Sequence, residues 1–325
     1  MAQFRSLSAD DVREILAAFG GPAYVSHAPV AAGTINTNVR VETADGLRFL
    51  RINEGKTRED VEREGAIVAH VAARGVPTPP PARTAAGAPF VEWRGLFVSM
   101  FPWIPGRTLT RAEVTPAHAA LVGGALARLH LASEGFADRR PGRYEPEEID
   151  RRVRHVETLA KPELVGPIAV VGLALAELAR ERAPELPTGL IHGDLFIDNV
   201  LFAESANAEL TALIDFEQAS WGRFAYDVAV TLLAFGYGRH DFRADVTRAF
   251  LEAYAAVRPF APAERAAFGA ELRFAACRFA VTRITDVHLK RGTGAPGGKD
   301  FNRYLARLGS VEVHLATRDH LLDLP

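Results

Sequence analysis

Apolar and polar positions along the first hundred residues predict one helix followed by short strands. The segment ADDVREILAAF has helical spacing, follows Ser8 and contains Asp11 three residues after that serine, so we expect a capped amphipathic helix from about 9 to 19. Asp45 and Gly46 have the composition of a hairpin turn. The pattern predicts a five-stranded antiparallel sheet, with strands at 23–30, 38–43, 47–53, 89–93 and 96–101.

Helical spacing dominates the remainder of the chain. A charged helix at 59–75 comes before a connector at 76–87, in which four prolines exclude a helix. The proline-punctuated stretch FPWIPGRTL marks a boundary, so we expect a first domain over residues 1–102 and a mainly helical second domain over residues 103–325. Further helices are predicted at 116–133, 146–159, 164–183, 224–238, 241–257, 262–291 and 300–320, with a loop at 291–300.

Composition narrows the possible partners and the compartment. The chain carries 38 basic and 40 acidic residues, so no basic surface indicates binding to nucleic acid or to an anionic membrane. The uncharged stretch from Leu164 to Ala176 is too short to cross a bilayer and is interpreted as a buried helix. MAQFRSLSADDVRE lacks the apolar run of a signal peptide. Cys277 is the single cysteine, so no internal disulfide can form, which fits a reducing cytoplasm. This cysteine is predicted to be a buried structural thiol.

Three oxygen-bearing side chains lie at the ends of a predicted hairpin in the second domain. Its strands, 200–202 and 211–214, are joined by a polar loop, and Asp194, Asn199 and Asp215 lie just outside them. Carboxylate and amide oxygens are suitable ligands for a hard divalent cation such as magnesium, and one carboxylate can be left over to accept a proton. The alternative is that these residues only cap turns, where Asp and Asn are common.

The spacing of these residues resembles that of kinase loops. HGDLFIDN has four residues between Asp194 and Asn199, like the kinase motif HRDxxxxN, and Asp215 begins IDFE where kinases have DFG. With Gly193 in place of the kinase arginine, the loop is similar to that of the aminoglycoside phosphotransferase and choline kinase superfamily. The resemblance implies an α+β, protein kinase-like bilobal fold. It also implies that Asp194 is the base facing a substrate hydroxyl, while Asn199 and Asp215 hold Mg²⁺ against the phosphates of ATP.

The same resemblance implies that the first domain binds the nucleotide. The loop AAGTINTN, with Gly33, Thr34 and Asn36, is expected to lie over the phosphates, although an ordinary hairpin loop is the alternative. Arg51 occupies the position of the kinase lysine that pairs with phosphates. Glu64 matches the helix glutamate that forms an ion pair with this basic residue; the alternative is a solvated charge on a charged helix face.

Other residues acquire roles from the resemblance. The kinase hinge lines the adenine pocket, so Met100, Phe101 and Trp103 are expected base contacts, unless these side chains are simply core. Asp227 lies in the apolar run FAYDVAVTLLAF, where an ionised carboxylate needs several hydrogen-bond donors. The resemblance implies that it supports the catalytic loop, the alternative being a solvent-facing carboxylate. His192 is interpreted as a structural anchor of that loop rather than as a general acid or base.

Several longer segments resemble bacterial homoserine kinases of the aminoglycoside phosphotransferase type. They include LHLASEGFADRRPGRY, LTALIDFEQASWGRFAYDVAVTL and FAVTRITDVHL. The resemblance implies transfer of the γ-phosphoryl group of ATP to L-homoserine, which gives O-phosphohomoserine for threonine synthesis. Arg283 and Asp286 are candidates for binding the amino-acid groups of the substrate. Two alternatives remain: a kinase for another small alcohol or an aminoglycoside, and a non-catalytic nucleotide-binding module.

Overall fold

The computed structural model describes residues 5–30, 36–182, 185–205, 207–291 and 300–325. Its contacts divide the chain into two compact units. The first unit contains residues Met1–Gly106 and Thr211–Glu217, and the second contains Arg107–Leu210 and Gln218–Pro325. The predicted boundary after residue 102 lies close to the observed division after Gly106. The prediction did not include the short internal segment Thr211–Glu217 in the first unit.

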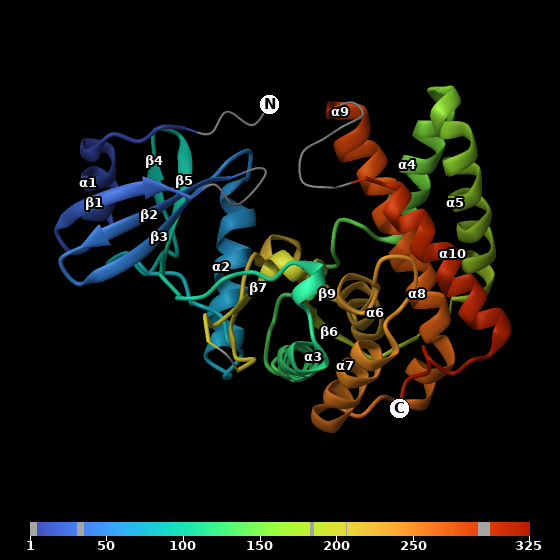
Figure 1. Ribbon diagram of the computed structural model, residues 1–325. Coiled ribbons are helices and arrows are strands. Elements are labelled where there is room, and N and C mark those ends of the chain that lie inside the picture. The colour runs from blue at the N-terminus through green and yellow to red at the C-terminus, as the bar shows by residue number, and fades with distance from the viewer. Residues whose placement is uncertain (1–4, 31–35, 183–184, 206, 292–299) are drawn as a thin grey trace. The chain divides into compact units, whose positions relative to one another are not determined.

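The first unit is built on the predicted five-stranded antiparallel sheet (Figure 1), with strand order β1-β2-β3-β5-β4. Ser8 and Asp11 form the expected capping box of α1, and the buried side of this helix packs against the sheet through Val12, Ile15 and Leu16. The elements are α1 (Ala9–Ala18), β1 (Tyr24–Pro29), β2 (Thr37–Thr43), β3 (Gly46–Asn53), α2 (Arg58–Ala72), β4 (Val91–Trp93) and β5 (Leu96–Pro102).

Register within this sheet determines where the polar side chains of β3 lie. Arg51 lies opposite Asn38 of β2 and Ser99 of β5. The neighbouring residues Leu50 and Ile52 are fully buried in the core. Side chains of adjacent strand residues point to opposite faces, so Arg51 lies on the face that does not hold Leu50 and Ile52.

The segment Thr211–Glu217 belongs to the first unit, although Arg107–Leu210 of the second unit separates it in sequence from Met1–Gly106. Its strand β8 (Leu210–Leu213) pairs with β7 (Val200–Phe202), which confirms the predicted hairpin, and the 3₁₀ helix η3 (Phe216–Gln218) follows. The backbone N–H of Leu213 donates a hydrogen bond to the carbonyl of Pro77 in the connector after α2 (2.7 Å). This bond ties the segment to the first unit.

Helices make up most of the second unit, as predicted, and α8 lies among α4, α5, α6 and α10. A small antiparallel sheet of β6 (Thr188–Ile191) and β9 (Ser220–Arg223), which the sequence pattern did not predict, flanks the loop at 192–199. The other elements are η1 (Arg111–Glu113), α3 (Pro116–Leu131), α4 (Pro146–Thr158), α5 (Pro162–Glu181), η2 (Ile197–Asn199), α6 (Phe224–Phe235), α7 (Ala244–Val257), α8 (Pro262–Thr282), α9 (Leu289–Arg291) and α10 (Asn302–Thr317).

The predicted single helix over 262–291 is wrong in one respect. Its α-helical part, α8, ends at Thr282 and continues as a π-helical turn, Arg283–His288 (η4), before α9 begins. A π turn adds a residue to the helical repeat, which changes the direction of the following side chains. The loop predicted at 291–300 lies almost wholly outside the described residues.

The interpretation of residues 164–176 as a buried helix also needs correction. Helix α5 buries only one side, and Val165, Val170 and Leu173 are 57%, 51% and 70% exposed. Among the described helices, α5 alone is long and apolar enough to cross a membrane by length and composition. That test is also passed by helices packed in soluble proteins, and the buried side of α5 packs against α4 and α8.

Candidate active site

The loop with Asp194 and Asn199 connects β6 to β7 in the second unit and is held by its own hydrogen bonds. The Asp194 carbonyl accepts hydrogen bonds from the Phe196 N–H (2.8 Å) and from Nδ2 of Asn199 (2.8 Å). Because the amide nitrogen of Asn199 is used within the loop, its Oδ1 is the atom left to bind a cation. Asn199 ends a short 3₁₀ helix (Ile197–Asn199), and its side chain is tied to the backbone of Asp194.

Gly193 is required by the geometry at the start of this loop. Its φ of +74° lies in the left-handed region, where residues with a side chain are strained. A Cβ at this position would also lie 3.0 Å from the Gln218 carbonyl. The backbone conformation and the close contact with Gln218 thus explain why glycine occupies the position of the kinase arginine.

Asp227 holds the start of the loop through hydrogen bonds to its backbone. Its carboxylate is fully buried in α6 and accepts hydrogen bonds from the N–H groups of His192 and Gly193, each 2.8 Å long. Nε2 of His130 lies 3.0 Å from the same carboxylate, and the His130 Nδ1 lies 2.6 Å from the Tyr254 hydroxyl. His192, predicted as an anchor, is fully buried.

The protonation of this buried pair follows from its surroundings. Burial alone would raise the pKa of Asp227, but hydrogen bonding from His130 and the charges of His130 and His192 outweigh burial and lower that pKa. Burial lowers the pKa of His130, and Asp227 only partly reverses this effect. Asp227 is therefore a stable anion at neutral pH and holds the loop backbone through charge-assisted hydrogen bonds.

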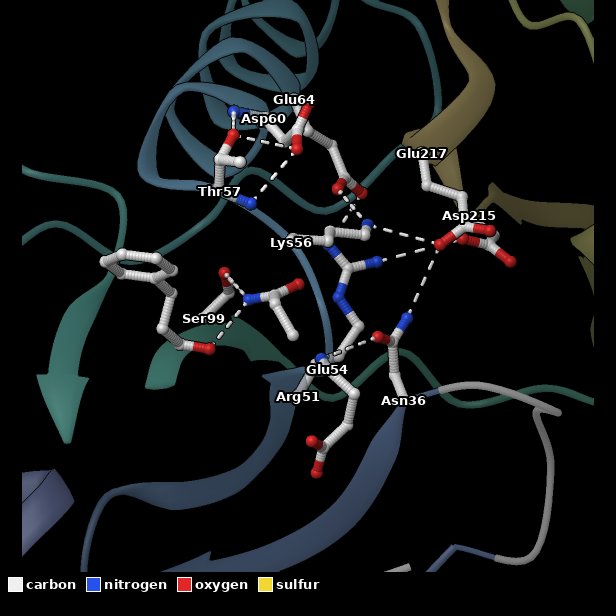
Figure 2. A network of polar contacts seen from close by, with 12 residues as sticks. Asn36, Arg51, Glu54, Lys56, Thr57, Asp60, Glu64, Ser99, Asp215 and Glu217 are labelled. Carbon is white, nitrogen blue, oxygen red and sulfur yellow. Dashed lines mark hydrogen bonds and ion pairs between the residues drawn. The ribbon is translucent and has the colours of Figure 1, made fainter. Parts of the chain in front are cut away.

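The first unit contains a connected network of charged side chains (Figure 2). Arg51 and Glu64, predicted to pair, form an ion pair of 2.6 Å with both side chains less than a tenth exposed. Lys56 bridges Glu64 (3.0 Å) and Glu217 (3.2 Å). Nη1 of Arg51 lies 3.8 Å from the Asp215 carboxylate, which connects β3 and α2 to the internal segment of this unit.

Arg51 and Glu64 both remain ionised at neutral pH. Burial would raise the pKa of Glu64, but the nearby charges of Arg51 and Lys56 outweigh it, and the net shift is downward. Burial would likewise lower the pKa of Arg51, whereas Glu64 and Asp215 raise it by a larger amount. Lys56 was not predicted from the sequence, because it lies in the turn after β3, where no periodicity indicates its direction.

Asp215 projects from a strained backbone and is accessible. Its φ is +64°, a left-handed conformation that Asp adopts more readily than most residues, and its side chain is 42% exposed. Asn36 joins the same network, with its Oδ1 accepting from the Glu54 N–H (3.2 Å) and its Nδ2 3.5 Å from Glu217. Gly33 and Thr34, expected to lie over the phosphates, are outside the described residues.

The predicted hinge residues already have partners in the first unit. The Met100 carbonyl accepts from the Ala82 N–H (2.7 Å), and the Trp103 N–H donates to the Leu47 carbonyl (3.3 Å). The ring of Phe101 packs near that of Phe49. A base that uses the Met100 carbonyl or the Trp103 N–H must share or replace these bonds.

The predicted substrate residues Arg283 and Asp286 lie on the π turn of the second unit. Arg283 donates to the Asp300 carbonyl (3.1 Å) and stacks on Tyr304, with 4.5 Å between guanidinium and ring centre. Asp286 accepts a 2.8 Å hydrogen bond from Arg152. Both residues therefore have protein partners.

Another arginine, Arg278, was missed by sequence reasoning and contacts the catalytic loop. Nη1 of Arg278, on α8, is 3.7 Å from the Asp194 carboxylate. Its sequence context, an apolar helical run, indicated only a core position. The presence of an arginine in an apolar run could have indicated a functional or paired residue, because a buried charge needs a partner.

No cluster of three or more His, Cys, Asp or Glu side chains that could hold a metal occurs among the described residues. Magnesium sites often use only one or two protein ligands and take the others from phosphates and water. Asn199 and Asp215 each offer an oxygen of the right type. Asn199 belongs to the second unit, and Asp215 belongs to the first unit.

Comparison with known proteins establishes the family. Residues 26–268 match the sequence profile of APH, the phosphotransferase enzyme family. The chain therefore belongs to the phosphotransferase enzyme family. The predictions of this superfamily, of its kinase-like α+β fold and of an enzyme that phosphorylates a hydroxyl group are confirmed.

Particular relatives lie within that family. The chain is 32% identical over 330 residues to a homoserine kinase of Bradyrhizobium sp., covering 99% of this chain and 98% of the relative. It is 33% identical over 289 residues to a homoserine kinase of Xanthobacter autotrophicus, covering 88% of each. Among solved structures, the amicoumacin kinase hAmiN has a TM-score of 0.67 at 16% identity, with 94% of this chain and 92% of that chain covered.

Proposed function

We propose that this protein is an ATP-dependent kinase that phosphorylates the side-chain hydroxyl of L-homoserine. The observation that carries the proposal is the similarity to homoserine kinases over 99% of the chain, together with an intact Asp194–Asn199 loop. ATP is supported by the nucleotide analogue AMP-PNP in the complex of hAmiN, which also contains Ca²⁺. Magnesium is the divalent cation we propose for this chain, and the cytoplasm is the proposed compartment.

The proposed mechanism relies on positioning and on charge. Asp194 accepts a hydrogen bond from the acceptor hydroxyl and receives its proton as the hydroxyl oxygen forms a bond to the γ-phosphorus. The bond between that phosphorus and the bridging oxygen breaks, and ADP leaves. Asn199 and Asp215 would hold the magnesium ion, which would neutralise charge on the phosphates.

Residues of the first unit are proposed to bind the nucleotide. Arg51, fixed by Glu64, supplies positive charge to the phosphates, and Asn36 lies in the same network. Gly33, Thr34, Met100, Phe101 and Trp103 remain predicted nucleotide contacts. Asp227 and His192 support the loop, and Arg283 and Asp286 remain predicted substrate contacts.

Asp194→Asn tests the proposed base. We expect kcat for L-homoserine to fall at least 10²–10⁴-fold, the usual contribution of a positioned general base, with nearly unchanged nucleotide affinity. Asp198→Asn is the matched control, because this exposed carboxylate of the same loop has no proposed role and should retain activity. Wild-type turnover in the Asp194 variant would show that the base is assigned wrongly.

A substrate screen tests the proposed acceptor. Turnover with magnesium and ATP is measured for homoserine, serine, choline, methylthioribose and kanamycin. Preference for homoserine supports the proposal, whereas preference for another alcohol contradicts it and leaves a different small-molecule kinase. Nucleotide binding without turnover of any acceptor would contradict the enzymatic function itself.

A further inference from the structure

A cavity of about 190 Å³ lies within the second unit next to the catalytic loop. Gly193, which immediately precedes Asp194, forms part of its wall, together with residues of β6, β9 and α8. The aromatic rings of Tyr144 and Tyr226 also contribute. Burial raises the pKa of Tyr226 to about 12, so it remains a neutral hydroxyl. The cavity therefore has the size and position to hold a small molecule near the proposed base.

Positive charge dominates the wall of this cavity. The arginines at 143, 182, 223 and 278 line it, and Glu145 is the only acidic residue among its described lining. Arg182 and Arg223 both bind the fully buried Glu271, with contacts of 2.7 and 2.8 Å. Glu271 thus partly compensates their charge, whereas the ion pair of Arg278, with Asp194, is longer at 3.7 Å.

Arg278 is a buried cation without a full set of partners. Its residue is 3% exposed, and its guanidinium stacks between Tyr144 (4.1 Å to the ring centre) and Phe279 (3.7 Å). Its Nε has no hydrogen-bond partner among the described atoms. The distance of 3.7 Å to Asp194 is too long for a hydrogen bond. A buried donor left in this state is unfavourable, and a carboxylate oxygen of a ligand would satisfy it.

We propose that Arg278 binds the carboxylate of the acceptor and thereby makes the enzyme select hydroxy amino acids over amino alcohols. The inference deepens the proposed function and rests on it for the position of the reacting hydroxyl. A guanidinium fork matches a carboxylate, and a short acceptor whose carboxylate contacts Arg278 reaches Asp194 with its hydroxyl. Arg283, which the sequence analysis selected as a candidate for binding the amino-acid groups of the substrate, does not line the cavity.

The decisive experiment compares two acceptors that differ only in the carboxylate. L-homoserine and 3-amino-1-propanol are assayed with wild type and Arg278→Gln. We expect kcat/KM for homoserine to fall roughly 10- to 100-fold, the range for hydrogen bonds to a charged group. The value for 3-amino-1-propanol should change by less than about threefold, because that acceptor has no carboxylate to lose. An equal loss with both acceptors would mean that Arg278 only orients Asp194, and the proposal would be overturned.

Two further variants separate binding from folding. Arg278→Lys keeps the charge but loses the fork, so the preference for homoserine should be intermediate; if Arg278→Gln does not fold, this variant is read by the same criterion. Arg273→Gln is the matched control, since Arg273 is a buried arginine of the same helix that binds Glu177, Glu181 and Glu312. Its loss should leave the ratio of the two kcat/KM values unchanged.

A binding assay keeps the inference testable if the proposed function fails. Should wild type not phosphorylate homoserine, calorimetry with L-2-aminobutyrate and propylamine measures carboxylate recognition without turnover. Selective binding of L-2-aminobutyrate by wild type that is lost in Arg278→Gln supports the role of Arg278 alone. Equal binding by both proteins, or no binding by wild type, overturns it.

Discussion

Arg51 holds two carboxylates at once, and its geometry explains why arginine is accepted where kinases have lysine. One terminal nitrogen binds Glu64 and the other lies 3.8 Å from Asp215. A lysine ammonium is a single point charge and does not span two such positions with fixed geometry. The neighbouring Lys56 adds a compact charge to the same Glu64.

Glu64→Gln tests the strength of this buried network. Breaking a buried ion pair leaves uncompensated charge, so we expect a loss of about 3 kcal/mol in the free energy of unfolding at pH 7. The folded-state pKa of Glu64 is lowered from 4.5, so its contribution is present above pH 4.5 and is lost as pH falls through the folded-state pKa. The difference between variant and wild type in urea denaturation should therefore narrow in acid.

Glu62→Gln is the control for that measurement. Glu62 lies on the same helix, is 53% exposed and pairs with Arg58 at 3.8 Å, so its loss should change stability by less than about 0.5 kcal/mol. Equal effects of the two substitutions would contradict a structural role for the Arg51–Glu64 pair.

At the scale of single residues, the sequence was informative where a motif fixes both type and spacing. Asp194, Asn199, Arg51 and Glu64 could be selected in this way. Arg278 could not, because a helical position in an apolar run does not tell which wall its guanidinium joins. That information comes from packing between α8 and the loop before α4, which holds Tyr144.

Close packing of α3 against α7 depends on one glycine. A Cβ on Gly123 would lie 2.3 Å from the Phe250 carbonyl, which belongs to backbone and cannot move aside by rotation. Gly123→Ala should therefore destabilise the protein by about 1–3 kcal/mol, the range for overpacking, as measured by urea denaturation.

The adjacent Gly124 supplies the control. A Cβ there would meet only the Arg128 side chain at 3.6 Å, an ordinary contact. Gly124→Ala should be neutral or stabilise the protein by up to about 1 kcal/mol, because alanine favours helix more than glycine does. A similar response of the two variants would show that the helices separate without cost.

Elements with long periodic patterns were predictable, and very short ones were not. Strands β6 and β9 have four residues each, too few for alternation to be distinguished from chance. The π turn after α8 follows helical spacing without interruption, so only the backbone reveals it. Helix α5 was expected to be buried because apolar composition does not tell how many sides have a neighbour.

For the whole molecule, binding of magnesium and ATP should increase thermal stability. Ligand at about 100 times its Kd adds roughly 2.7 kcal/mol to the free energy of unfolding. We expect a higher Tm with ATP and magnesium than with ATP and EDTA, and a smaller difference in Asp215→Asn. Asp45→Asn, in the β2–β3 turn, should behave as wild type. The same Tm with magnesium and with EDTA would contradict the proposed metal site.

The division into units was only partly predictable from the sequence. Prolines after β5 indicated a boundary near residue 102, close to the division after Gly106. The assignment of Thr211–Glu217 to the first unit depends on contacts with Arg51, Lys56 and Pro77, which are more than a hundred residues away in the chain. No local pattern contains that information.

Because Thr211–Glu217 belongs to the first unit, the protein cannot be divided into its two units by a single cut in the chain. A gene fragment that stops after Gly106 lacks the seven-residue piece with Asp215 and Glu217, so in its N-terminal product Arg51 and Lys56 keep Glu64 but each loses its second carboxylate partner. The complementary fragment carries that piece with nothing of its own unit to pack on. Exchange of halves between relatives at a single crossover therefore separates residues that contact one another, and a working chimera needs a second junction around residues 211–217.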